Sequence, residues 1–333
     1  MFDKQILTGG GQNAAHKFRD ERIDSVKYFL IILVILGHVF IIDEYSVVPE
    51  CITAKKWIYL FHMPLFIFIS GYFSNKKEKK AFLPSILKLL EPLLIYHIIF
   101  LLLEIIIKGK TITWIDALTP WGLLWYLLSL IYWRMMIQFT PNKILNNKKL
   151  VLIGTFCISI IAGFLPFDRF LSIQRTLAFM PFFFLGYYMK GQKLFLPNKY
   201  KPLCFIFLFL TFSVPIFFPQ YLGTLSHCFP YNSYDDAFKR MLVFCFSIPM
   251  SIAFINICPT KPWFAKQGKL TLQYYIYHPI ITIPMTIITI MLNIPFSFIT
   301  AIIFAITLTI ILGIASYVPY FSKFTNPSSF FKT

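Results

Sequence analysis

The chain has 333 residues, of which 57% are hydrophobic and only 14% are charged, and its formal net charge is +17. A soluble core does not need this much apolar sequence, and the apolar runs repeatedly reach the length of about 20 residues that crosses a membrane. The composition therefore excludes an ordinary soluble enzyme. It predicts an all-α fold, a polytopic integral membrane helix bundle.

We expect about ten transmembrane helices. The predicted spans are residues 26–42, 57–73, 84–107, 121–140, 150–165, 172–189, 202–218, 241–257, 271–292 and 298–318. The fifth is short and the eighth contains Pro249, so these two are the least regular. Residues 1–25 are expected to form a cytoplasmic N-terminal segment, residues 26–320 the membrane domain and residues 321–333 a cytoplasmic tail.

The positive charge follows the predicted loops. With a cytoplasmic N-terminus, 20 of the 31 Lys and Arg residues fall on the inner side and 7 in the outer loops. An excess of Lys and Arg in cytoplasmic loops is the usual orientation of a membrane protein. The distribution therefore predicts a multi-pass protein of the inner or plasma membrane with both termini in the cytoplasm. Membrane topology therefore accounts for most of the positive charge, so no nucleic-acid partner is expected.

The first predicted span carries two ionisable side chains on one face. Lys27 and His38 are 11 positions apart, which places them about 20° apart around a helix and about 16 Å apart along it. Asp24 is positioned to pair with Lys27 across one turn. An ionisable group at membrane depth is costly and indicates function, and imidazole can transfer protons near neutral pH. The alternatives are an interfacial anchor for Lys27 and a packing role for His38.

Polar residues also occur in later spans. In the second, His62 precedes Pro64 and Ser70 lies near the end. His278 follows three tyrosines in the ninth span, which suggests a water-lined face or, equally, packing. The third span contains Glu91, His97 and Glu104, while Arg134 and Arg175 lie in or near the fourth and sixth. Ion pairs between helices are the alternative to a functional site for these groups.

The six cysteines form no Cys-x-x-Cys pair, so the sequence predicts no metal site. Cys51 and Cys228 both fall in predicted outer loops. They are either a disulfide or, more simply, free thiols.

Several segments together resemble the membrane-bound acyltransferase family 3, in particular its fucose 4-O-acetylase-like branch. Asp24-x-x-Lys27, followed by the apolar run to Gly37-His38, resembles the basic–x10–His opening of that family. The run 61–72 resembles its second-helix motif, and 125–130, 181–187 and the stretch around 277–278 resemble later segments. The likeness covers about residues 20–320.

The resemblance implies an integral membrane O-acyltransferase, most simply an O-acetyltransferase. It would transfer the acyl group of cytoplasmic acetyl-CoA, a donor substrate rather than a bound cofactor, to a hydroxyl of a surface polysaccharide or lipid-linked glycan. We expect catalysis by His38 and Asp24, donor binding by Lys27 and Arg175, and acceptor binding by His62, Ser70 and His278. Many relatives carry a hydrolase-like domain outside the membrane, which we do not expect here, so polysaccharide-synthesis proteins are possible partners.

Two other classes of protein fit the same pattern. A glycan or lipid transporter or flippase would share the intramembrane charges and the proline-containing helices, although no inverted repeat is visible. A structural subunit of a polysaccharide synthase would have no need of His38.

Overall fold

The computed structural model describes residues 21–219, 230–318, 321 and 325. Most of the predicted terminal segments 1–25 and 321–333, and Cys228 with its predicted pairing, lie outside these residues. Within them the fold is all-α and contains no strand, as predicted. The helices are α1 Glu21–Val39, α2 Pro49–Tyr72, α3 Lys79–Lys108, α4 Trp114–Leu118, α5 Trp125–Phe139, α6 Asn142–Leu145, α7 Lys148–Ile161, α8 Ile173–Tyr188, α9 Lys201–Thr211, α10 Val214–Phe217, α11 Asp235–Ile257, α12 Pro262–Gly268, α13 Thr271–Met291 and α14 Phe298–Ala315.

Every predicted span coincides with helical structure. Six of the described helical segments are long and apolar enough to cross a membrane, namely Pro49–Tyr72, Lys79–Ile107, Asn198–Phe217, Asp235–Ile257, Thr271–Met291 and Phe298–Ala315. The chain is therefore a polytopic membrane bundle, while the number of ten crossings stays a prediction.

Two predicted boundaries differ from the structure. The second helix begins at Pro49, eight residues before the predicted span, so Cys51 is a buried helical residue and not part of an outer loop. A proline is favourable in the first turn of a helix, which explains the early start. The predicted span 202–218 is divided, because α9 ends at Thr211 and α10 begins at Val214.

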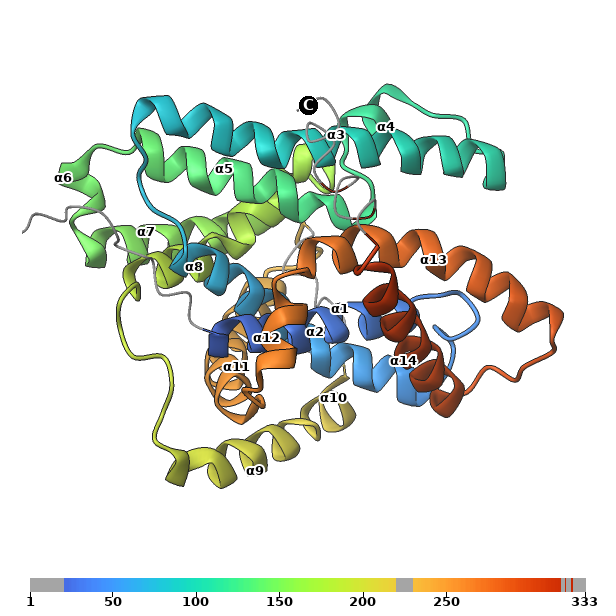
Figure 1. Ribbon diagram of the computed structural model, residues 1–333. Coiled ribbons are helices and arrows are strands. Elements are labelled where there is room, and N and C mark those ends of the chain that lie inside the picture. The colour runs from blue at the N-terminus through green and yellow to red at the C-terminus, as the bar shows by residue number, and fades with distance from the viewer. Residues whose placement is uncertain (1–20, 220–229, 319–320, 322–324, 326–333) are drawn as a thin grey trace, which may run out of the picture.

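The helices form two adjoining groups (Figure 1). Helices α3, α5, α8 and α7 pack one against the next, while α1 contacts α2, α12, α13 and α14. The two groups meet where α2 packs along α8. This contact joins residues from the first third of the chain to the middle of the chain, and it forms the centre of the bundle.

Two glycines allow α2 and α8 to approach closely. A Cβ added to Gly71 would lie 1.9 Å from the carbonyl oxygen of Phe183, and one added to Gly186 would lie 1.9 Å from that of Phe68. Small residues at such crossings let helix backbones touch within a membrane. The two glycines of the resemblance segments 61–72 and 181–187 therefore have a packing function, and each meets the backbone of the other glycine's helix.

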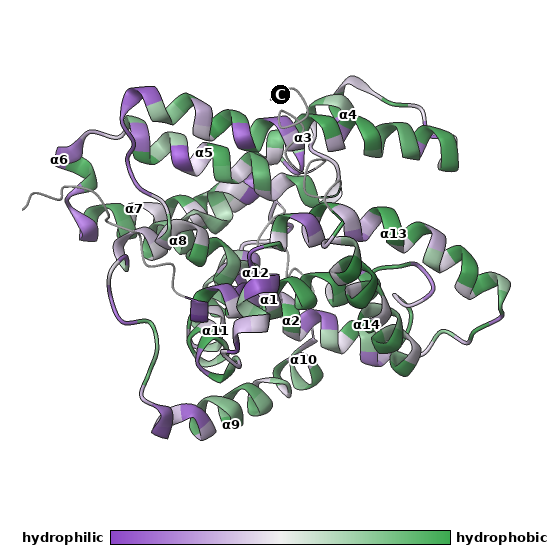
Figure 2. Cartoon of the chain, viewed as in Figure 1, coloured by the Kyte–Doolittle hydropathy of each residue, from purple (hydrophilic) through white to green (hydrophobic). Residues whose placement is uncertain are grey.

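The outer surface is suited to lipid. Large apolar side chains remain exposed on the helices at the edge of the bundle, for example Ile106 on α3, Phe209 on α9 and Ile299 on α14. Figure 2 shows these helices as largely hydrophobic, with polar residues gathered at α6 and at the beginnings of α3 and α9. Those polar ends carry lysines that the charge pattern assigns to the cytoplasm.

Candidate active site

The structure brings His38 and His278 together. His38 lies in the last turn of α1 and His278 in the third turn of α13, and the Nδ1 atom of His38 lies 2.6 Å from the Nε2 atom of His278. The two rings are nearly parallel, with an interplanar angle of 11° and centroids 4.8 Å apart. Two histidines 240 positions apart in the sequence therefore form one hydrogen-bonded pair.

The second ring nitrogen of His278 defines the direction of this hydrogen bond. Nδ1 of His278 lies 2.9 Å from the backbone carbonyl of Tyr274, which can only accept a hydrogen bond. Nδ1 must therefore carry a proton, which leaves Nε2 of the neutral ring as an acceptor. His38 consequently donates from Nδ1, and its own Nε2 has the free lone pair of a general base.

The arrangement favours one positive charge, not two, on the pair. Two imidazolium rings with centroids 4.8 Å apart would repel by about 3.5 kcal/mol at an effective dielectric constant of about 20. His38 is half-buried and His278 is 1% exposed. A positive charge on both rings at once is therefore disfavoured, and the neutral form of His38 can take up a proton.

Asp24 and Lys27 form the ion pair that their spacing predicts. The Nζ atom of Lys27 lies 2.6 Å from Oδ1 of Asp24, and the two side chains are 16% and 1% exposed. Asp24 is held at a tight helix contact, since a Cβ added to Gly268 of α12 would lie 1.7 Å from its carbonyl oxygen. Asp24 and His38 are 14 positions apart in α1, or about 21 Å. This geometry separates Asp24 from His38, so its predicted role cannot be direct contact.

The other predicted residues of α2 are placed inside the bundle. His62 is buried in the middle of α2, not at its entrance, and its Nδ1 lies 2.8 Å from the carbonyl of Ile58. Ser70 lies 2.6 Å from the hydroxyl of Tyr126. The ring of Tyr126 packs edge-on against Tyr275 of α13.

The tyrosines before His278 belong to the packed core. Tyr274, Tyr275 and Tyr277 are all buried. Tyr274 donates to Gln267 Oε1, Tyr275 to the carbonyl of Leu123 and Tyr277 to the carbonyl of Phe321. The alternative of a packing role, rather than a water-lined face, therefore describes this segment, and it gives α13 the rigidity that orients His278.

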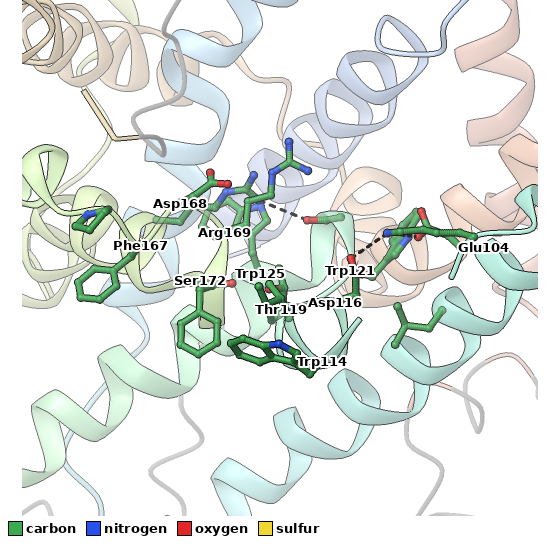
Figure 3. Close-up of a pocket in the computed structure, with 18 residues that line it drawn as sticks. Glu104, Trp114, Asp116, Thr119, Trp121, Trp125, Phe167, Asp168, Arg169 and Ser172 are labelled. Atoms are coloured by element: carbon green, nitrogen blue, oxygen red, sulfur yellow. Dashed lines mark hydrogen bonds and ion pairs between the residues drawn. The ribbon is translucent and has the colours of Figure 1, made fainter. Parts of the chain in front are cut away.

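A cavity of 660 Å³ lies beside this region, at the end of α3 and along the segment that leads into α8 (Figure 3). Arg175 lines it, lies over the ring of Trp125 at 5.4 Å and donates to the carbonyl of Gly122 at 3.5 Å. The next residue, Leu123, accepts a hydrogen bond at its carbonyl from Tyr275 of α13, so these contacts lead from Arg175 to the helix that carries His278.

Two of the ionisable residues of the third span, Glu104 and His97, have structural partners. Lys110 bridges Glu104 and Asp116, with both distances 3.0 Å. His97 accepts from the backbone N–H of Trp121 at Nδ1 and donates from Nε2 to the carbonyl of Ala117. His97 therefore fastens the connection between α3 and α5, which forms one wall of the cavity.

Sequence reasoning did not identify this wall. Trp114 and Asp116 lie in a short connection between predicted spans and Trp121 begins the next predicted span, so the density of tryptophan was the available clue. From the sequence, His278 is also expected among the acceptor-binding residues, and its contact with His38 is not predicted. That contact depends on the rotation of α13 relative to α1, which no local sequence pattern encodes.

The structure is a polytopic membrane bundle with a pair of histidines in its interior. The comparisons with known proteins identify the family. The profile of a family described as an acyltransferase domain matches residues 20–318. The chain belongs to this acyltransferase family, and its described helices form a multi-pass membrane bundle.

Two curated relatives are similar to part of the chain. Nodulation protein NolL of Mesorhizobium japonicum is 33% identical over 183 residues, which is 51% of this chain and 47% of the relative. Nodulation protein NolL of Sinorhizobium fredii is 30% identical over 192 residues, 54% of this chain and 50% of the relative. The chain spans about half the length of the curated relatives it matches, and no solved structure matches it significantly.

Proposed function

We propose that the protein transfers an acyl group, most simply acetyl, from cytoplasmic acyl-CoA to a hydroxyl of a carbohydrate. The observation that carries this proposal is the hydrogen-bonded series from the Tyr274 carbonyl through His278 to His38, which leaves Nε2 of His38 as a base. Membership of the acyltransferase family supports the reaction class. Surface polysaccharides and lipid-linked glycans are the acceptors that fit a protein in the cell membrane.

The reaction needs one proton acceptor and returns the proton. Nε2 of His38 takes the proton of the sugar hydroxyl as its oxygen attacks the thioester carbonyl, and an ester bond forms while the carbon–sulfur bond breaks. The imidazolium then protonates the leaving thiolate, so free CoA departs as a thiol. The alternative route passes through an acyl group on Nε2 of His38, which the sugar oxygen then removes.

Lys27 fits the handling of the donor, whereas the balanced charges around Arg175 do not favour the phosphates of CoA. Lys27 lies on the same helix as His38, about 16 Å nearer the predicted cytoplasmic end, a separation that an extended pantetheine arm can bridge. A cation at this end favours the phosphates of CoA, with the lysines of the inner loops beside it. Asp24 holds Lys27 in place through their ion pair and thus acts as a positioning residue.

The test is acyl-CoA turnover by the purified protein in lipid nanodiscs, measured as free CoA thiol released in the presence of the host's surface glycan. Wild type should release CoA and acylate the glycan, whereas His38→Ala and His38→Gln should lose a factor of roughly 10² to 10⁴ in rate. Gln fills the space and forms hydrogen bonds but cannot take up a proton.

A matched control is Thr286→Val, because the hydroxyl of Thr286 donates to the Thr282 carbonyl within its own helix α13. This control should keep near-normal turnover. Glycan movement across the membrane without release of CoA would establish a transporter instead, and near-normal acetylation by either His38 variant at equal expression would refute the proposed base.

A further inference from the structure

The cavity beside Arg175 has a mixed aromatic and polar wall that the proposed chemistry does not use. It measures 660 Å³ and lies between the end of α3, α4, the start of α5 and residues 166–175 (Figure 3). Pockets of a few hundred Å³ with some well-placed polar groups are the usual sites for small ligands.

One tryptophan in this wall offers an open ring face. Trp114 is 69% exposed and meets Phe170 only edge-on, with centroids 6.4 Å apart. In contrast, Trp121 is stacked on Phe100 with centroids 4.2 Å apart, and Trp125 is stacked on Phe179. Of the three tryptophans in the lining, Trp114 is therefore the one available to stack against a ligand.

Two hydroxyls in the wall lack partners within the described part of the chain. The Oγ of Ser172 and the Oγ1 of Thr119 are both buried without a hydrogen bond, and Ser172 is 1% exposed. Leaving a buried hydroxyl unsatisfied costs about as much as a lost hydrogen bond. A ligand that carries several hydroxyl groups would satisfy both residues from the cavity side.

The segment that presents Ser172 is strained. Asp168, Leu171 and Ser172 adopt positive φ values of 41°, 48° and 55°, although none of them is glycine. Such conformations are costly, persist only where the surrounding structure enforces them, and gather at binding sites. Asp168 and Ser172 both belong to the lining of the cavity.

The charges of the wall favour a neutral ligand. Three acids, Glu104, Asp116 and Asp168, stand against three bases, Lys110, Arg169 and Arg175. Lys110 is already shared by two carboxylates. The Thr113 hydroxyl, followed by the Lys110 ammonium, lowers the pKa of Asp116 to about 2, so this carboxylate is ionised and accepts hydrogen bonds. A diphosphate such as that of CoA finds no excess of positive charge here.

We propose that this cavity binds the sugar ring of the acceptor, with its apolar C–H face on Trp114 and its hydroxyls on Ser172, Thr119 and Asp116. The inference rests on the proposed function, since the contacts of Gly122 with Arg175 and of Leu123 with Tyr275 place the cavity against α13, the helix that carries His278. A neutral pyranose combines an apolar face with a rim of hydroxyls, which is the combination the wall presents.

An interfacial anchor is the competing explanation for Trp114, because tryptophans gather at membrane surfaces. The two explanations differ in their consequences. An anchor contributes to stability in the bilayer and has no effect on sugar binding, whereas a stacking platform contributes to binding and has little effect on stability.

The experiment uses His38→Ala protein in nanodiscs, so that binding is measured without turnover. The probes are the methyl glycosides of glucose, galactose, fucose and N-acetylglucosamine, followed by saturation-transfer NMR, with erythritol as a polyol that lacks an apolar ring face. At least one glycoside should bind and erythritol should not. Adding Trp114→Ala, or Ser172→Gly, which relaxes the positive φ while removing the hydroxyl, should weaken that binding at least tenfold.

Tyr234→Ala is the matched control, because Tyr234 is an exposed aromatic residue on the same predicted side of the membrane and is not part of the cavity wall. It should leave binding unchanged. The proposal is overturned if none of the glycosides binds, or if Trp114→Ala lowers the melting temperature and leaves binding intact. CoA release by wild-type protein, measured separately, reports on the proposed function, which stands or falls independently of these binding results.

Discussion

The His278→Ala variant tests the hydrogen-bonded series behind the proposed base. The substitution removes the acceptor of the His38 Nδ1–H and leaves that proton donor unsatisfied inside the bundle. A buried donor without a partner costs about 1–3 kcal/mol. If this cost falls on the transition state, the rate of acyl transfer should drop roughly 5- to 150-fold.

The loss should appear in kcat, not in the KM for acyl-CoA, because His278 orients the base and does not contact the donor in this scheme. His278→Gln should recover much of the rate, since its amide oxygen can accept from His38 Nδ1. The assay is steady-state CoA release by purified variants whose melting temperatures are measured in parallel. A folded His278→Ala protein with wild-type kcat, or a Gln variant no better than Ala, would refute the reasoning.

Three further predictions concern the fold and its orientation. Gly71→Ala should lower the melting temperature markedly, because its Cβ would lie 1.9 Å from the Phe183 carbonyl, whereas Gly154→Ala, which meets nothing within 4 Å, should be neutral in the same thermal assay. Lys27→Ala should reduce both stability and turnover by removing the ammonium group that pairs with the Asp24 carboxylate, at a cost below the roughly 3–5 kcal/mol of a fully buried pair. Lys27→Arg should retain both, and equal turnover in the Ala variant would make Lys27 a mere anchor. In intact cells, an impermeant thiol reagent should label Lys55→Cys and Lys110→Cys but not Lys77→Cys or Lys266→Cys, and labelling at position 77 would contradict the predicted topology.

The fold class could be predicted because the length of each apolar run can be read directly from the sequence. Each predicted span coincides with helix, and the errors lie at the ends, as at Pro49, where the helix continues beyond the apolar run. The division of the span 202–218 was not predictable, since residues 212 and 213 belong to the same apolar stretch.

The site could be predicted only in part. The ion pair of Asp24 with Lys27 follows from helical spacing, and the structure confirms this contact. The contact of His38 with His278 depends on how α1 and α13 are rotated against each other, which is a tertiary property. The cavity depends on non-glycine residues with positive φ, namely Asp168, Leu171 and Ser172, which propensity rules assign to ordinary conformations.

Helix α1 is held at both ends, by the Gly268 contact at Asp24 and by the His278 contact at His38. The number of residues between Asp24 and His38 therefore fixes the position of one contact relative to the other. Removing or adding one residue between these contacts would turn one end by about 100° relative to the other, so that at most one of the two contacts could form. In related proteins that use the same two contacts, insertions and deletions should be confined to the loops and absent from this stretch of α1. An alignment of related sequences would show whether the number of residues between these two contacts is constant.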